Sequence, residues 1–214
     1  FESRFFNDAL TFGFDYYEKT TIGMLMDQPI PAYVGKGAPI ANAGDMENWG
    51  LEFEAGYKLK VNDFTFNVLA NASYLQNKLI KLGNESGEAI YESAGASGVG
   101  SYVKGMNGEV FPFFYGYKTD GLFQNQQEAD EYNTLYGEKA EPGDVRFVDL
   151  AGAKDANGND IPDGKINDSD KTKIGKGMPD WTFGLTLNAQ WKGFDASVFF
   201  QGAYGNDIFD FSQR

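Results

Sequence analysis

The chain contains five stretches in which apolar and polar residues alternate strictly. The alternation is clearest over residues 49–60, where the apolar positions are Trp49, Leu51, Phe53, Ala55, Tyr57 and Leu59. A period of two is that of an extended strand with one face in an apolar medium and the other in water. Strands of soluble sheets usually have about 5–6 residues, whereas a tilted strand needs about 9–11 to cross a bilayer. The length of the alternation therefore favours an all-β, antiparallel transmembrane β-barrel over a soluble sandwich.

The alternation predicts the strand positions directly. We expect strands near 5–19, 48–60, 63–76, 180–192 and 194–205. Aromatic residues gather near the strand ends, where a membrane–water interface selects amphipathic rings. Five strands do not close a barrel, because the smallest bacterial barrels have about eight. The remaining strands must come from sequence outside this chain or from another chain.

The links between these strands fall into two classes. Val61-Asn62 and Lys192-Gly193 are predicted hairpin turns, whereas 20–47 and 77–179 are long loops. In an antiparallel sheet, connections alternate between the two ends of the strands, so both short turns share one end and both long loops the other. Bacterial outer-membrane barrels have this asymmetry, with short periplasmic turns and long outer loops.

Composition excludes several other classes of protein. The chain has no run of eighteen apolar residues, which argues against membrane-spanning helices but not against barrel strands. A net charge of −13 disfavours nucleic acid as a partner. Histidine and cysteine are absent and no nucleophile or phosphate-loop motif stands out, so we expect no enzymatic activity. The chain starts at Phe1 without an initiator methionine, which suggests an internal piece of a longer protein.

The excursion 77–179 is too long to lack structure of its own. Residues 125–136 are expected to form a short helix with Asn125 as its N-cap. The aromatic residues of this region are candidates for stacking on a substrate or contacting a lid, or for forming the small core of the loop itself. They are Phe113, Tyr115, Tyr117 and Phe123.

An acidic stretch later in the same excursion resembles a calcium-binding loop. Calcium takes about six to eight oxygen ligands from a tightly turned loop. The candidate ligands are Asp155, Asn157, Asn159, Asp163 and Asp170. The residues Asp160-Ile161-Pro162 interrupt the plain motif, and the alternative is a surface loop in which Asp and Asn side chains cap their own backbone.

Five segments together resemble the SusC/RagA-type TonB-dependent transporters. They are Asp15–Leu25, Asn42–Glu52, Phe114–Phe123, Pro142–Asp149 and Ile174–Gly184, and they follow the order in which the family's motifs occur. The resemblance covers nearly the whole chain. It implies that the chain is a late part of a barrel of about 22 strands, located in the outer membrane of Bacteroidetes and closed by a plug that this chain does not include.

The resemblance also implies a function and partners. Such transporters import glycans, oligosaccharides or peptides with energy passed on by TonB, and a SusD-like lipoprotein forms a lid over their outer mouth. The alternative from another class is a soluble, calcium-stabilised β module for adhesion or glycan binding. That module would need its apolar strand faces to meet in a sandwich core, and it would stay monodisperse without detergent.

Overall fold

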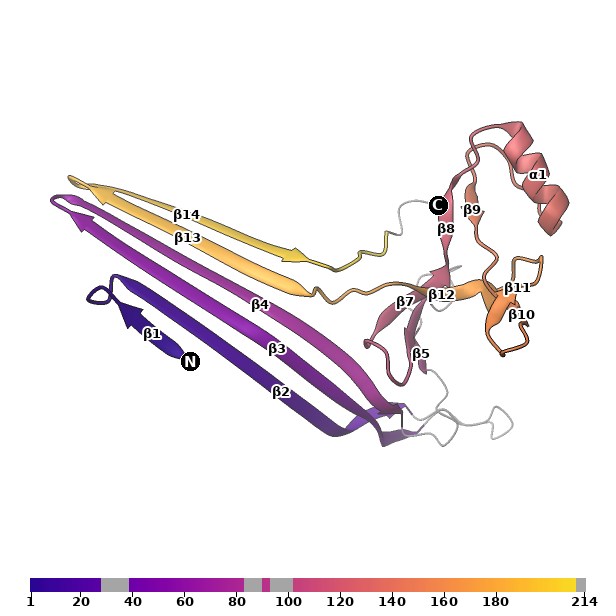
Figure 1. Ribbon diagram of the computed structural model, residues 1–214, viewed down its shortest axis with the longest axis horizontal. Helices are drawn as coiled ribbons and strands as arrows, with labels where there is room; N and C mark the ends of the chain where they lie inside the picture. Colours follow the sequence, from indigo (N-terminus) through magenta and orange to yellow (C-terminus); the bar gives the residue numbers. More distant parts are fainter. Residues whose placement is uncertain (28–38, 83–89, 93–101, 211–214) are drawn as a thin grey trace. The chain divides into compact units, whose positions relative to one another are not determined.

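The computed structural model describes residues 1–27, 39–82, 90–92 and 102–210. The chain divides into two compact units. The first unit comprises 1–91, 104–112 and 176–214, and the second comprises 92–103 and 113–175. Figure 1 shows the long strands of the first unit and the shorter elements of the second.

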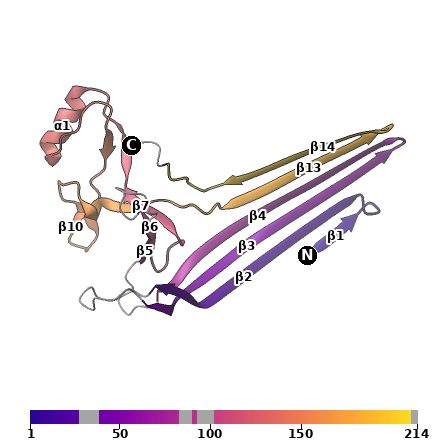
Figure 2. The same ribbon diagram turned by 180° about the vertical axis from the view of Figure 1, so that it is seen from behind.

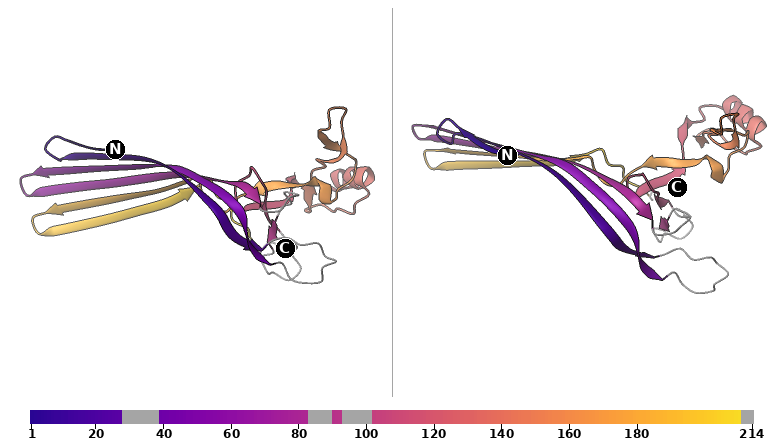
Figure 3. Two further views of the ribbon diagram at one scale, coloured as in Figure 1. Left: turned by 90° about the horizontal axis from the view of Figure 1, so that it is seen from below. Right: turned by 60° about the horizontal axis from the view of Figure 1, so that its bottom comes forward.

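A single six-stranded antiparallel sheet forms most of the first unit. Its order is β1-β2-β3-β4-β13-β14. The strands are β1 (Glu2–Phe5), β2 (Leu10–Asp27), β3 (Ile40–Val61), β4 (Phe64–Leu82), β13 (Trp181–Trp191) and β14 (Phe194–Tyr204). Figure 3 shows that β2, β3 and β4 bend and twist together along their length. The twist is the right-handed one that extended L-residues adopt.

The last two strands match the sequence prediction to within one or two residues, whereas β2, β3 and β4 are longer than predicted. The predicted outer loop 20–47 was therefore too long, because β2 continues to Asp27 and β3 begins at Ile40. The alternation ends near Thr21 because β2 and β3 shift register between Thr21 and Met24, where Gly23 has a φ of 69°. A bulge of this kind breaks the period of two while backbone pairing continues. Residues 28–38 of that predicted loop lie outside the described residues.

A turn at residues 6–9 divides the first predicted strand, 5–19, into β1 and β2. Phe6, Asn7 and Asp8 have φ values of 55°, 54° and 66°. Asn and Asp tolerate this left-handed conformation better than other residues with a Cβ atom, so they favour a turn here. The prediction of a continuous strand over 5–19 was wrong at this point, because the left-handed residues 6–8 reverse the chain before the alternating run begins.

The short turns lie at one end of the sheet, as predicted (Figures 1 and 2). The β13–β14 turn is Lys192-Gly193, with both residues at positive φ, as a type I′ hairpin turn requires. The β3–β4 turn is Asn62-Asp63, one residue later than predicted, with the positive φ at Asn62. Because β4 runs away from these turns, it ends, at Leu82, at the opposite end of the sheet.

The far end of β4 has a small core of its own. Leu79 and Leu82 are buried there. Segment 104–112 lies along this part of β4: the Leu79 backbone N–H donates to the Glu109 carbonyl (2.9 Å), and the Leu82 N–H donates to Asn107 Oδ1 (2.7 Å). The Asn77 side chain bonds both to the N–H and to the carbonyl of Phe111. Backbone groups of β4 thus remain paired beyond the six-stranded region.

The second unit is built from short strands and one helix. Its strands β7 (Phe113–Tyr117) and β12 (Lys171–Gly175) form an antiparallel pair. The division between the two units falls within β5 (Ile90–Glu92) and β6 (Val103–Gly105). The remaining strands of this unit form two hairpins. They are β8 (Thr119–Leu122) with β9 (Val145–Phe147), and β10 (Gly152–Lys154) with β11 (Asp160–Pro162). A short 3-10 helix, η2, spans Asp168–Asp170.

The helix α1 (Gln126–Tyr136) confirms the predicted helix and its N-cap. The Asn125 side chain accepts a hydrogen bond from the Glu128 N–H (3.0 Å), and the Glu128 carboxylate accepts from the Gln124 N–H (3.0 Å). These two bonds satisfy N–H groups at the helix start. The helix ends at Gly137, whose φ of 74° suits a residue without a Cβ atom. Capping thus defines both ends of the helix.

A close contact with an aromatic ring leaves no room for a Cβ atom at one position of the large sheet. Tyr17 of β2 lies opposite Gly50 of β3, and a Cβ atom at Gly50 would come within 2.6 Å of the Tyr17 ring and of the Tyr74 carbonyl oxygen. Gly13, on the same face, differs from Gly50 because a Cβ atom there would meet only Glu54 Cβ, at 3.6 Å, in ordinary contact. Gly50 is therefore required by packing, and Gly13 is not.

We predict that Gly50→Ala destabilises the folded sheet by about 1–3 kcal/mol, the usual cost of overpacking. The matched variant Gly13→Ala should change the free energy of unfolding by less than about 0.5 kcal/mol. Urea titration of the protein folded in detergent micelles measures both free energies of unfolding. The folded fraction at each urea concentration is read from the difference in gel mobility between unheated and heated samples. Equal stability of the two variants would contradict the packing assigned to Tyr17.

Candidate functional site

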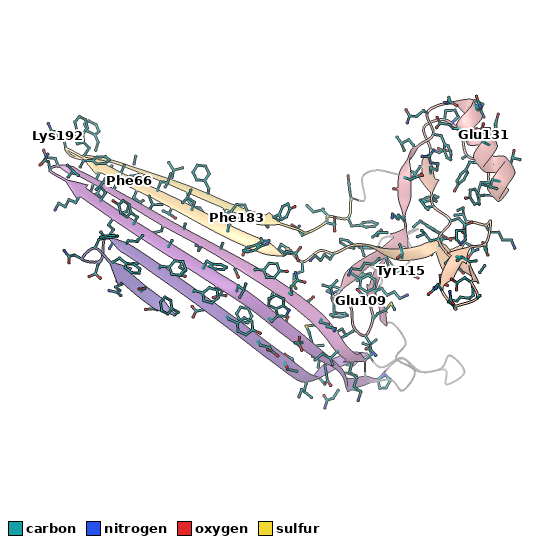
Figure 4. All side chains as sticks on the ribbon, viewed as in Figure 1. Phe66, Glu109, Tyr115, Glu131, Phe183 and Lys192 are labelled. Atoms are coloured by element: carbon teal, nitrogen blue, oxygen red, sulfur yellow. The ribbon has the colours of Figure 1, made fainter. Side chains whose placement is uncertain are left out.

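One face of the large sheet is apolar from edge to edge. The strand register places apolar residues directly beside one another in rows that cross the sheet. Two such rows are Phe12, Ala55, Ala70, Leu185 and Phe200, and Leu10, Tyr57, Val68, Leu187 and Val198. Phe66 of β4 and Phe183 of β13, labelled in Figure 4, belong to this face. Phe183 is 49% exposed and Phe200 is 54% exposed. An apolar sheet face that is half-buried at its centre, as at Val68 and Leu187, and exposed at Phe183 and Phe200 suits contact with hydrocarbon.

Aromatic residues form two belts across this face. One row contains Tyr16, Tyr74, Trp181 and Tyr204, and a second row contains Phe64, Trp191 and Phe194. In the first belt, the rings of Tyr74 and Trp181 have centroids 4.9 Å apart, and Trp49 lies 5.5 Å from Tyr74. Trp181 and Trp191 stand at opposite ends of β13. At ~3.3 Å per residue and a tilt of about 40°, the ten residue steps between them correspond to about 25 Å. That is the height of the apolar band in outer-membrane barrels.

The opposite face is polar and carries most of the charge of the sheet. One of its rows is Asp15, Glu52, Ser73, Thr182 and Ala203, and the next is Gly13, Glu54, Asn71, Gly184 and Gln201. Apolar exceptions are Leu69 and Phe199, which flank Thr186 in a single row. The polar face thus resembles a surface in contact with water or with another polar element.

We predict that a charge is costly on one face of β13 and tolerated on the other. Leu187 lies between Val68 and Val198 in the middle of the apolar face, so Leu187→Arg should destabilise the folded state by about 2–4 kcal/mol. Its neighbour Asn188 is on the polar face, so Asn188→Arg should cost less than about 1 kcal/mol. Urea titration in detergent micelles measures the free energy of unfolding of each variant. A similar loss of stability in both variants would argue against a hydrocarbon-facing surface.

The four aromatic candidates of the second unit divide into two pairs. Phe113 and Phe123 are each only 2% exposed and form its core, which is one of the two roles that the sequence leaves open. The Phe123 ring packs on Tyr132 at 5.0 Å. Tyr115 and Tyr117 are half-buried on β7. A substrate or lid contact by these residues stays a prediction.

Tyr117 adjoins a cavity of about 550 Å³ within the second unit. Phe147 and Tyr132 line the same cavity, and the Tyr132 hydroxyl donates to the Phe147 carbonyl oxygen (3.0 Å). Burial raises the pKa of the Tyr117 and Tyr132 phenols above the ordinary value of tyrosine. Sequence reasoning missed Tyr132 and Phe147 as cavity residues, because only the tertiary fold brings the helix and β9 together.

The acidic loop forms a hairpin held by its own side chains. Asp155, at the tip between β10 and β11, accepts hydrogen bonds from the N–H groups of Asn157 and Asn159, both at 2.8 Å. The Asn159 side chain also donates to Asp155 (2.9 Å), and this bond is the main cause that lowers the pKa of Asp155. At the base of the hairpin, Asp149 accepts from the N–H of Asp163 (3.2 Å) and of Gly164 (2.8 Å). The bond from the Asn157 N–H to Asp155 is an Asx turn, as the alternative interpretation expects, whereas the Asp149 bonds join segments distant in sequence.

Asp170 joins two parts of this loop. Its side chain is fully buried and accepts from the N–H groups of Leu150 (2.7 Å), Ala151 (3.0 Å) and Asn167 (2.8 Å). Burial alone would raise the pKa of this carboxyl group, but the backbone N–H donors outweigh burial and lower it. Asp170 thus holds residues 150–151 against the start of η2.

Calcium binding by Asp155, Asn157, Asn159, Asp163 and Asp170 stays a prediction. The first three residues lie at the tip of the β10–β11 hairpin, whereas Asp163 and Asp170 follow β11. Among the residues that the structure describes, no group of three or more acidic side chains converges in a way that could hold a metal ion.

We predict that Asp170→Ala opens this loop, because it leaves three N–H groups without their acceptor, at a cost on the order of 2–4 kcal/mol. Hydrogen exchange of the peptides that cover 148–170 should accelerate. Asp168→Ala is the matched control, because the Asp168 side chain is 88% exposed and its partners among the described residues are the side chains of Lys171 and Tyr117. Equal exchange in both variants would contradict the role given to Asp170.

The same contact predicts a pH dependence. The folded-state pKa of Asp170 is lowered from 3.8, so its contribution to stability is complete above the unfolded pKa and is lost as pH falls through the folded value. The protection from exchange that Asp170 gives to the 148–170 peptides should therefore stay constant between pH 5 and pH 7 (about one to three pH units above the unfolded pKa). Opening that began near neutral pH would disagree with this assignment.

Comparisons with known proteins agree with the geometry. No protein-family model matches the chain. The chain is 32% identical over 97% of its length to TonB-dependent receptor P3 of Formosa agariphila, of which it covers 20%. It is 29% identical over 96% of its length to TonB-dependent receptor SusC of Bacteroides thetaiotaomicron, of which it covers 18%. The chain is thus similar to proteins named TonB-dependent receptors, SusC among them. It spans about a fifth of the length of the curated relatives that it matches.

Solved structures show the fold of this chain. It superimposes on the RagAB peptide importer in its closed-closed state with a TM-score of 0.71 at 23% identity, covering 96% of this chain and 20% of that one. The RagAB importer in its open-open state gives a TM-score of 0.68 at 20% identity, with 94% and 19% covered. The predicted fold class, part of a transmembrane β-barrel, is thereby confirmed. Among the described residues, no helix is both long enough and apolar enough to cross a bilayer, a finding that does not bear on barrels.

Proposed function

We propose that this chain forms part of an outer-membrane importer that takes up nutrients with energy transmitted through TonB. In this proposal β1–β4, β13 and β14 are part of the barrel wall. Their apolar face contacts lipid, and their polar face lines the lumen or packs against a plug. The chain moves solutes and catalyses no reaction.

The observation that carries the proposal is the pair of aromatic belts on a continuous apolar face. A separation of about 25 Å between belts matches an apolar band in an outer membrane, and no soluble environment selects such a band. The relatives support the same conclusion, because they are named TonB-dependent receptors and a peptide importer.

The topology supports an orientation for the chain. The short turns near Asn62 and Lys192 lie at one end of the sheet, and the chain leaves β4 at the other end. In bacterial barrels the short turns are periplasmic and the long connections extracellular. We therefore place the second unit on the cell surface, where it can meet substrate and a SusD-like lipoprotein that acts as a lid. The proposed substrates are oligosaccharides or peptides.

A deletion strain and affinity purification test the proposal. The complete protein, tagged in a periplasmic turn, should fractionate with the outer membrane, remain soluble only in detergent, and co-purify with a surface lipoprotein. Deletion of its gene should abolish growth on at least one oligosaccharide or peptide supplied as sole carbon source, and removal of TonB should do the same. Recovery of the protein from the soluble fraction as a monodisperse species would overturn the proposal in favour of the adhesion or glycan-binding module.

A further inference from the structure

The cavity beside Tyr117 has the size and lining of a ligand site. Its volume of about 550 Å³ falls within the range of about 300–1,000 Å³ typical of small-molecule pockets. Aromatic rings of Tyr117, Tyr132 and Phe147 line it, and so do the charged residues Glu138, Lys139 and Asp144. All of these residues belong to the second unit, so the cavity is complete within it.

Phe147 provides a partly exposed aromatic surface on a fixed support. Its ring packs against Tyr117, with centroids 5.2 Å apart and planes at 49°, yet the residue remains 37% exposed. Tyr117 is held in turn by its hydroxyl contact to Asp168 (3.3 Å) and by the Lys171 ammonium group 5.3 Å from its ring centre. A ring that is already held in place loses little conformational freedom when a ligand packs on it.

The rim of the cavity offers hydrogen-bonding groups of both kinds. Glu138 and Lys139 are exposed, and neither takes part in a salt bridge in the part of the chain that the structure describes. Asp144 uses one carboxylate oxygen to accept from the Glu141 N–H (2.8 Å). Carboxylate acceptors and an ammonium donor around an aromatic surface match a ligand that has a flat apolar face and hydroxyl groups at its edge.

The backbone around the cavity argues against a peptide bound as an added strand. Peptides that bind in this way need free N–H and C=O groups along a strand edge. Here the Asp144 carbonyl accepts from the Phe123 N–H (3.1 Å), the Phe147 carbonyl accepts from the Tyr132 hydroxyl, and the Val148 N–H donates to the Lys118 carbonyl (3.0 Å). Two of these bonds belong to the pairing of β9 with β8, and the third occupies the Phe147 carbonyl on the other edge of β9, so part of the main chain that an extended peptide would use is already bonded.

We propose that this cavity binds a hexose unit of a neutral oligosaccharide, with the C–H face of the sugar on Phe147 and its hydroxyl groups on Glu138, Lys139 and Asp144. The proposal rests on the proposed import function and assigns a substrate class to one site of it. The net charge of −13 and the two rim carboxylates disfavour sulfated or uronic-acid sugars through repulsion.

Binding measurements on the complete protein in detergent micelles test this assignment. An array of neutral, uronic-acid and sulfated oligosaccharides, together with a library of short peptides, provides the probes, and the strongest neutral probe is then titrated by calorimetry. Phe147→Ala should weaken its binding by about tenfold or more, the loss expected for an aromatic contact and its buried area. Phe147→Trp should restore binding. Leu122→Ala is the matched control, because Leu122 is exposed on neighbouring β8 and does not line the cavity.

The outcomes separate this proposal from the import function. Hydrogen exchange across the second unit first establishes that Phe147→Ala is folded. Equal affinity of Phe147→Ala and wild type, or array binding confined to peptides or anionic sugars, would overturn the sugar site. A growth defect of the deletion strain alongside either result would leave the import function standing. Failure of the protein to reach the outer membrane would instead overturn the import function itself.

Discussion

A strand in hydrocarbon must have its backbone N–H and C=O groups hydrogen-bonded to neighbouring strands, because no water is present to replace a lost partner. The large sheet meets this requirement through long, continuous pairing. Strand β13 pairs with β4 on one side and β14 on the other over its whole length, Trp181–Trp191, without a register shift. The bulge between β2 and β3 begins only at Thr21, beyond the aromatic row that contains Tyr16. Regular pairing and the apolar band therefore coincide.

That pairing determines which side chains meet. Because the register is continuous, residues of one kind align in rows across several strands, and the two tryptophans of β13 fall into two separate aromatic belts. A slip of one residue in any strand would move its apolar side chains to the polar face. The membrane-facing surface is thus a consequence of backbone register as much as of composition, and Gly50 shows how closely neighbouring strands pack to keep it.

The sequence predicted the elements that local interactions define, and it failed where residues distant in sequence determine the structure. Strands β13 and β14 were predictable because alternation runs to both ends and Lys192-Gly193 marks the turn. The α1 helix was predictable because Asn125 caps it locally. The continuation of β2 past Gly23 was not predictable, because the bulge there interrupts the alternation of apolar and polar residues. The acidic loop shows the limit most clearly: spacing suggested Asp170 as a calcium ligand, but only the fold reveals that it bonds the N–H groups of Leu150 and Ala151. The Phe147 cavity likewise joins residues distant in sequence.

Site-directed spin labelling along β4 tests the central claim most directly. The chain contains no native cysteine, so single cysteines can be introduced one at a time at positions 64–74 and labelled in a lipid bilayer. The account predicts that labels at even positions, such as Phe66 and Val68, are accessible to oxygen dissolved in lipid, whereas labels at odd positions, such as Asn67 and Asn71, are accessible to a water-soluble nickel complex. Accessibility without this period of two, or even positions shielded from lipid by protein, would contradict it.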